Sequence, residues 1–133
     1  MPKVYFLDTG IRNMIIRVFT DVMNRPDKGE LLENGVFAEI YRHLDILSTL
    51  QFWRTKQGTE VDLIARRNEK LILIEIKSRK YQKPPHLLPF ASFEEIHGKA
   101  AQKIIIHMGA ELIRQKNVIL LPACLSGKIR TLL

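Results

Sequence analysis

The stretch Thr59-Glu-Val-Asp-Leu-Ile-Ala-Arg-Arg-Asn-Glu-Lys-Leu-Ile-Leu-Ile-Glu-Ile-Lys77 decides the fold of this chain. Two runs rich in aliphatic residues, 59–66 and 70–77, lie on either side of Asn68-Glu69. Runs of this length and composition are typical of strands, and a two-residue connection is typical of a β-hairpin. We therefore predict an antiparallel hairpin that turns at Asn68-Glu69.

The register of this hairpin brings acidic residues together. A two-residue turn places Asp62 opposite Glu75 and Glu60 opposite Lys77. Because side chains alternate along a strand, Asp62, Glu75 and Lys77 would share one face of the hairpin. Like charges across an antiparallel pair repel, and a divalent cation between them would remove that cost. Mg²⁺ is commonly held by one or two carboxylates, with water and substrate phosphate as the other ligands.

A third acid lies on the helix predicted before the hairpin. An apolar stripe with three- and four-residue spacing predicts a helix over residues 30–47. Glu33 falls on that stripe, whereas Glu39 lies on the polar face of the same helix. An acid on the buried side of a helix is costly unless it is paired or bound to a metal. We therefore choose Glu33, and not Glu39, as the third candidate.

The remaining elements complete an α/β pattern. After an N-terminal strand and helix, the order is helix, three strands, helix, strand, helix, strand, which predicts a mixed central β-sheet flanked by helices. The additional predicted elements are a strand at 3–7, a helix from Asp8-Thr9 to Phe19, a strand at 50–56, a basic proline-containing loop at 78–89, a helix from Ser92 to Ala100 with Ser92 and Glu95 as a capping box, a strand at 103–107, a helical turn at 109–115 and a strand at 117–121.

The length of 133 residues predicts one domain. We divide it into an N-terminal strand and helix extension at 1–29, a core at 30–121 and a tail at 122–133. No run of apolar residues is long enough to span a membrane, no secretory signal is visible, and the single Cys124 forms no internal disulfide. We expect a cytoplasmic protein with no membrane partner.

The charge balance makes a polyanionic partner plausible, although many small domains are basic merely for solubility. Twenty-one Lys and Arg against 14 Asp and Glu leave a net charge of +7. Cations gather at strand ends and in the proline-containing loop, where they either track phosphates or form an ordinary solvated surface. These residues are Arg66, Arg67, Arg79, Lys80 and Lys83.

A purely structural interpretation of the acidic hairpin stays open at this point. Glu60 opposite Lys77 is an ordinary cross-strand ion pair, and alternating charged and apolar residues are typical of a half-solvated strand. Other catalytic or metal sites have less support. The four histidines lack paired spacing for zinc, and no G-x-S-x-G motif is present for a serine hydrolase.

Three motifs together resemble the PD-(D/E)xK nuclease signature. They are Glu33 on the helix, Gly58-Thr-Glu-Val-Asp62 and Ile74-Glu-Ile-Lys77, in that order. The resemblance implies an α/β restriction-endonuclease-like core of helix, three strands, helix and strand. Val61 stands where the name-giving proline would be, and no Gln-x-x-x-Tyr follows the lysine strand.

A second resemblance covers most of the chain. Lys3-Val-Tyr-Phe-Leu-Asp-Thr-Gly10, Leu31-Leu-Glu-Asn34 and Trp53-Arg-Thr-Lys-Gln-Gly-Thr-Glu-Val-Asp62 resemble the C-terminal domain of unknown function of a family of prokaryotic AAA-type P-loop ATPases. The chain has no G-x-x-x-x-G-K-[ST] motif and therefore cannot hydrolyse ATP by that route.

The nuclease resemblance implies a role for each candidate residue. Asp62, Glu75 and the Ile76 carbonyl would bind Mg²⁺ or Mn²⁺, Lys77 would be the catalytic lysine, and Glu33 would orient water or a second metal. The expected function is metal-dependent hydrolysis of a nucleic-acid phosphodiester, with DNA as the expected substrate.

Two other functions remain open. The first is a non-catalytic DNA-binding or regulatory module that serves an AAA-type ATPase, and a homo-oligomer is possible for this module as it is for the enzyme. A two-helix DNA-binding unit at residues 8–47 has less support, because it leaves the acidic hairpin without a role.

Overall fold

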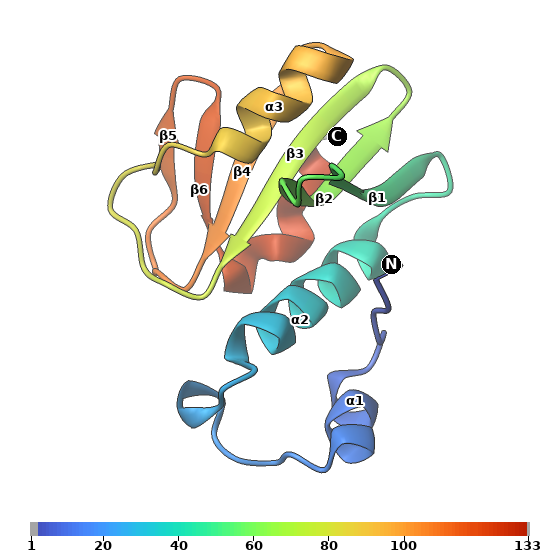
Figure 1. Ribbon diagram of the computed structural model, residues 1–133, viewed down its shortest axis with the longest axis vertical. Helices are drawn as coiled ribbons and strands as arrows, with labels where there is room; N and C mark the ends of the chain where they lie inside the picture. Colours follow the sequence, from blue (N-terminus) through green and yellow to red (C-terminus); the bar gives the residue numbers. More distant parts are fainter. Residues whose placement is uncertain (1–2, 133) are drawn as a thin grey trace.

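Strand β3 (Lys70–Lys77) lies inside a six-stranded sheet in the computed structural model, which describes residues 3–132 (Figure 1). The strand order is β1-β2-β3-β4-β6-β5. Strands β1 to β3 are antiparallel, β3, β4 and β6 run parallel, and β5 is antiparallel to β6. The other strands are β1 (Ser48–Arg54), β2 (Glu60–Arg67), β4 (Gln102–His107), β5 (Ile113–Gln115) and β6 (Val118–Pro122).

Helices lie against both faces of the sheet, which confirms the predicted α/β class with a mixed sheet (Figure 1). Helix α2 and η2 pack with the isoleucines of β3 in one apolar cluster, and α3 packs with Leu73 in the other. The sheet is therefore a buried middle layer. The helices are α1 (Thr9–Ile16), η1 (Val22–Asn24), α2 (Lys28–His43), α3 (Leu88–His97) and η2 (Ala123–Leu132).

The predicted hairpin forms in the predicted register. Leu63 pairs with Ile74, and the pairing continues to Arg67 opposite Lys70. Asn68 takes a positive φ of 53°, a backbone conformation that asparagine adopts more readily than most residues. The two-residue turn and the apolar runs on either side of it therefore specify the same register.

Several other predictions were wrong. Residues 3–7 form no strand and run as an extended segment beside α2. Residues 109–115 form no helical turn, because Ile113–Gln115 pairs with β6 as strand β5. Helix α3 begins at Leu88 rather than at the predicted Ser92 capping box, since Pro89 occupies its first turn, where its missing N–H costs nothing.

Some element ends also differ from the predictions. Helix α1 ends at Ile16, with Arg17 in the left-handed conformation, and so does not reach Phe19. Helix α2 ends at His43 rather than at Leu47. The tail folds as η2, and its Ile129 is fully buried in the cluster with α2. No helix in the described part of the chain has the length and apolar character needed to cross a membrane.

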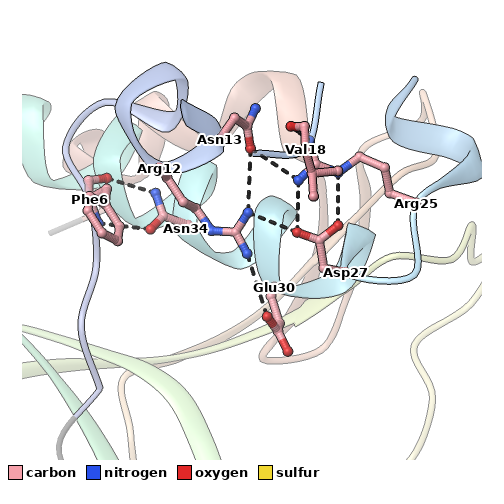
Figure 2. Close-up of polar contacts among 8 residues, drawn as sticks. All are labelled: Phe6, Arg12, Asn13, Val18, Arg25, Asp27, Glu30 and Asn34. Atoms are coloured by element: carbon pink, nitrogen blue, oxygen red, sulfur yellow. Dashed lines mark hydrogen bonds and ion pairs between the residues drawn. The ribbon is translucent and has the colours of Figure 1, made fainter. Parts of the chain in front are cut away.

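Polar contacts fasten the N-terminal extension to the start of α2 (Figure 2). The Arg25 guanidinium donates from Nε and Nη2 to Asp27, both at 2.8 Å, and Arg12 donates to the same carboxylate at 2.9 Å. The bonds from Arg25 and Arg12 hold the pKa of Asp27 well below its usual range. Further along α2, Asn34 accepts from the Phe6 N–H at 2.8 Å and donates to the Phe6 carbonyl at 2.7 Å.

We predict that Asp27→Asn lowers the urea midpoint of unfolding, because the buried Arg25 charge then loses its carboxylate. The control is Glu30→Gln, whose exposed carboxylate lies 3.5 Å from Arg12 and which we expect to leave the midpoint almost unchanged. Circular dichroism in urea at neutral pH measures both. Equal midpoints for the two variants would contradict this account of the extension.

Candidate functional site

Strand β2 carries a β-bulge at the predicted aspartate. The register between β1 and β2 shifts between Gln51 and Trp53, so that the one residue between them faces both Asp62 and Leu63. As a result Val61 packs in the cluster with α3 and Leu63 in the cluster with α2. Regular alternation would have placed these two side chains on one face.

The bulge turns the Asp62 carboxylate toward the N-terminal segment, away from the face that regular alternation predicts for it. Its Oδ1 lies 3.9 Å from Lys3 Nζ, and its Oδ2 accepts a 2.8 Å hydrogen bond from the backbone N–H of Ile76. The last backbone pair of the hairpin is Leu63 with Ile74. Beyond it, the Ile76 N–H of β3 donates to the Asp62 side chain instead of to the backbone of β2. The predicted sharing of one face by Asp62, Glu75 and Lys77 is therefore wrong for Asp62, but its carboxylate still interacts with that of Glu75, because the backbone pairing of β2 with β3 ends at Leu63 and Ile74.

Glu75 is an acid inside the sheet. Its side chain is 7% exposed, and its Oε1 accepts a 2.5 Å bond from Lys77 Nζ, whose side chain is 35% exposed. The other oxygen, Oε2, is buried and accepts no hydrogen bond of normal geometry within residues 3–132, although the backbone N–H of Asp62 lies close to the Glu75 carboxylate and opposes the rise in its pKa. A buried carboxylate oxygen without a donor is costly, so Glu75 retains unused capacity for a cation or a donor.

A second group of acids surrounds Lys3. The Lys3 ammonium lies 2.7 Å from Glu33 Oε1, forms an ion pair with Glu60 and lies 3.9 Å from Asp62. The Tyr5 hydroxyl also donates to Glu33 Oε1, at 2.5 Å. Glu33 is therefore paired, as an acid on the inner side of a helix must be.

The carboxylates perturb one another. Burial, followed by the charges of Glu75 and Glu33, raises the pKa of Asp62 to about 7, although the Ile76 N–H and Lys3 offset part of the rise. Burial also raises the pKa of Glu75, and its bond with Lys77 opposes that change. Ionising Asp62 and Glu75 together is thus unfavourable without a further positive charge.

The residues fit one weakly chelated cation rather than a closed metal cage. In the part of the chain that is described, no three His, Cys, Asp or Glu side chains are grouped to hold a metal. Two neighbouring carboxylates and the unpartnered Glu75 Oε2 suit a cation that keeps most of its water, as Mg²⁺ does. Glu33 is occupied by Lys3 and Tyr5 and is not placed as a direct ligand.

The structural alternative for the hairpin, an ion pair between Glu60 and Lys77, is not what forms. Lys77 bonds to Glu75 instead. Glu60 pairs with Lys3 and lies 3.6 Å from Arg54. Lys3 is a member of the acid cluster that no motif predicts. The one signal in the sequence is its spacing from Tyr5, since side chains two residues apart in an extended segment point to the same side.

A buried histidine anchors the loop that follows Lys77. His107 is fully buried, and its Nδ1 accepts from the Tyr81 N–H at 3.1 Å. Nε2 therefore carries the ring hydrogen and faces the Glu111 carbonyl at 3.2 Å. A Cβ on Gly109 would lie 2.4 Å from the same ring, so only glycine fits there. These contacts fix the position of the loop that follows β3.

The anchored loop presents its cations to solvent. Arg79, Lys80 and Lys83 are exposed, and Tyr81 lies half-buried between them. The loop lines a groove of about 820 Å³, formed by Lys80, Tyr81, Gln82, Lys83, Pro84 and Pro85. The two lysines at this groove, in the loop that follows Lys77, suit a phosphate-bearing ligand.

Comparison with known proteins gives one family match. A family model described as a domain of unknown function, DUF4143, matches residues 28–125. No curated protein matches the chain. The matched range contains the acidic hairpin, Glu33 and the basic loop, and it begins at the first residue of α2.

We predict that Asp62→Asn leaves stability unchanged or raises it by about 1 kcal/mol at pH 8 without divalent cations. The folded-state pKa of Asp62, about 7, lies above the unfolded value. Its contribution to stability is therefore complete below the unfolded pKa and is lost as the pH rises through 7. The advantage of the variant should accordingly shrink between pH 8 and pH 5. Urea denaturation in EDTA at both values measures it.

The control for this prediction is Asp45→Asn. Its bond from Ser48 and the charge of Arg67 lower the pKa of Asp45, so this carboxylate stabilises the protein at neutral pH. We expect Asp45→Asn to be less stable than the parent at pH 8, opposite in sign to Asp62→Asn. A clear loss of stability in both variants at pH 8 would mean that Asp62 is a structural partner of Lys3.

Proposed function

We propose that this chain, which belongs to the DUF4143 family of domains of unknown function, hydrolyses a nucleic-acid phosphodiester with the help of a divalent cation. The observation that carries the proposal is Glu75. Its buried Oε2 accepts no hydrogen bond of normal geometry from any of residues 3–132, Lys77 bonds to its Oε1, and Asp62 nearby has a raised pKa. Perturbed acids beside a lysine are a common feature of catalytic sites.

The order of elements supports the same proposal. Helix α2, strands β1, β2 and β3, helix α3 and strand β4 follow one another along the chain. This is the order that the resemblance to the PD-(D/E)xK nucleases implies, and a restriction-endonuclease-like core is therefore part of the proposal. Glu33 lies on α2, Asp62 on β2 and Glu75 on β3, which are the kinds of element on which the resemblance expects the site residues.

Asp62, Glu75 and the Ile76 carbonyl would hold Mg²⁺ or Mn²⁺. In such sites the cation neutralises phosphate charge and lowers the pKa of water. Asp62 is already oriented by the Ile76 N–H, which limits the rearrangement required of its carboxylate. Glu75 is held by Lys77 on one oxygen only, so its second oxygen is available for the cation.

Lys77 would stabilise the charge that develops on the phosphate. Its side chain is the more exposed partner of the Glu75 pair, and three rotatable N–H donors let one ammonium bind Glu75 and a phosphate oxygen together. Glu33, fixed by Tyr5 and Lys3, would orient water at the far side of Asp62. The basic groove at 80–85 would bind the strand that leaves the site, with DNA as the proposed substrate.

A second candidate function is a docking or regulatory module for an AAA-type ATPase. The observation that favours it is the apolar surface of the N-terminal extension, where several large side chains lie exposed on or near α1. They are Val4, Leu7, Ile11, Met14, Ile15, Ile16, Phe19, Val22 and Met23. None of these side chains is a proposed ligand of the cation, so docking and hydrolysis are compatible in one chain.

We predict that the parent protein cleaves plasmid or oligonucleotide DNA with Mn²⁺, that EDTA stops the reaction, and that Lys77→Ala slows it about a hundredfold or more. The expected loss is that of one charge-stabilising donor in the transition state. Single-turnover cleavage of a labelled oligonucleotide measures it.

The control is Lys128→Ala, which removes an exposed lysine of η2 and leaves the acids intact. We expect its rate to equal that of the parent. If single-stranded, duplex and branched substrates all stay intact with Mn²⁺, the hydrolase proposal fails and the docking module is favoured.

We also predict a steep dependence of DNA affinity on salt. The logarithm of the binding constant should fall with the logarithm of salt concentration by about 0.9 per neutralised duplex phosphate. Replacing Arg79, Lys80 and Lys83 with alanine should flatten this slope, because these side chains extend from the loop next to Lys77. Fluorescence anisotropy over a series of salt concentrations measures it.

The control for the salt prediction carries the same change of net charge elsewhere. Replacing the exposed Lys116, Lys128 and Arg130 with alanine should leave most of the slope in place. Equal slopes for the two triple variants would show a diffuse charge effect, and a flat slope in the parent would remove the nucleic-acid proposal.

A further inference from the structure

Lys3 lies where a positive charge is shared by acids from two elements. Its ammonium bonds to Glu33 of α2 at 2.7 Å, pairs with Glu60 of β2 and lies 3.9 Å from Asp62 in the bulge. Three carboxylates around one ammonium favour its charged form. One flexible side chain thus neutralises the part of the acid cluster that faces α2.

The backbone around Lys3 is fixed independently of that charge. Asn34 holds both the N–H and the carbonyl of Phe6 (Figure 2). The Tyr5 ring stacks on Phe37 with centroids 4.1 Å apart, and its hydroxyl bonds to Glu33. The segment therefore stays attached to α2 when the Lys3 ammonium leaves the acids, because none of these contacts involves the ammonium.

We infer that Lys3 is an internal counter-cation that competes with a divalent cation for the acid cluster, and that the N-terminal segment thereby controls the loading of the site. The inference rests on the proposed function, since it concerns the cation of that site. Lys3 lies near Asp62, a proposed ligand, and binds Glu33, the proposed water-orienting acid. A divalent cation on Asp62 would repel the Lys3 ammonium at this separation.

Glu75 distinguishes this arrangement from an ordinary ion-pair network. Lys3 contacts Glu33, Glu60 and Asp62, whereas the buried Glu75 Oε2 is left without a partner in residues 3–132. A single ammonium on the α2 side therefore compensates the cluster incompletely. A cation bound by Asp62 and Glu75 would satisfy that oxygen. The Lys3 ammonium would then move away from Asp62, while Asn34 would keep both of its hydrogen bonds to Phe6.

The competition makes a quantitative prediction for Mn²⁺ binding. Lys3→Met keeps the length of the aliphatic stem and removes the charge, so it should bind Mn²⁺ about tenfold more tightly than the parent, within the range that coupled sites usually show. Lys3→Arg keeps the charge and should bind Mn²⁺ about as weakly as the parent. Isothermal titration calorimetry of the full chain with Mn²⁺ as the sole ligand measures all three dissociation constants.

Two outcomes of this titration overturn different statements. Equal Mn²⁺ affinity in the parent and Lys3→Met overturns the role of Lys3 and leaves the metal site of the proposed function intact. Absence of Mn²⁺ binding in the parent and both variants overturns the metal site, and the role of Lys3 with it. Tighter binding in Lys3→Met alone supports both.

A measurement on the parent protein keeps the test independent of how the variants fold. Competition is reciprocal, so adding diamagnetic Mg²⁺ should speed solvent exchange of the Lys3 ammonium protons, observed by NMR on nitrogen-15-labelled lysine side chains. The backbone amide of Phe6 should stay protected, because Asn34 still accepts its hydrogen bond. Unchanged Lys3 exchange at Mg²⁺ concentrations that saturate the protein would overturn the inference.

Discussion

The burial of β3 on both faces is the constraint on which the rest of the molecule depends. β3 lies between β2 and β4, and the helices on either face leave residues 71–76 without significant exposure. Within that buried run Glu75 alone is charged. Its carboxylate has to find compensation inside the protein, and Lys77 supplies it from the next position on the same side of the strand. The chemistry of the site follows from that burial.

Compensation of the remaining acids links distant parts of the chain. Glu33 comes from the helix on one face, Glu60 and Asp62 come from the neighbouring strand, and Lys3 reaches them from a segment that belongs to no strand. The electrostatic balance of the centre of the domain thus depends on where the first described residues lie. Asn34 holds Phe6 of that segment, and Arg12 of α1 and Arg25 fasten the rest of the N-terminal extension to Asp27.

Local patterns predicted the features that local forces determine. The hairpin register follows from a two-residue turn flanked by apolar runs, and the place of Glu33 follows from helical spacing. The bulge at Asp62 left no signal, since Val61 and Leu63 are both apolar and both faces of β2 are covered. Lys3 was missed because its partners lie about 30 to 60 residues away, and such contacts are absent from spacing alone. The strand at 113–115 was not predicted either, because it forms only by pairing with β6.

The bulge also makes the number of residues in β2 important, and not only their apolar character. Removing one residue between Val61 and Ile64 would restore regular alternation while keeping the apolar character of the strand. If Asp62 is the residue removed, the carboxylate is lost, and if Leu63 is removed, the cluster with α2 loses one of its buried side chains. Either deletion would change the site or the core beside it, although Val61 and Ile64 would still face the cluster with α3. In aligning related chains, a gap in this strand is therefore a functional difference rather than a variation in loop length.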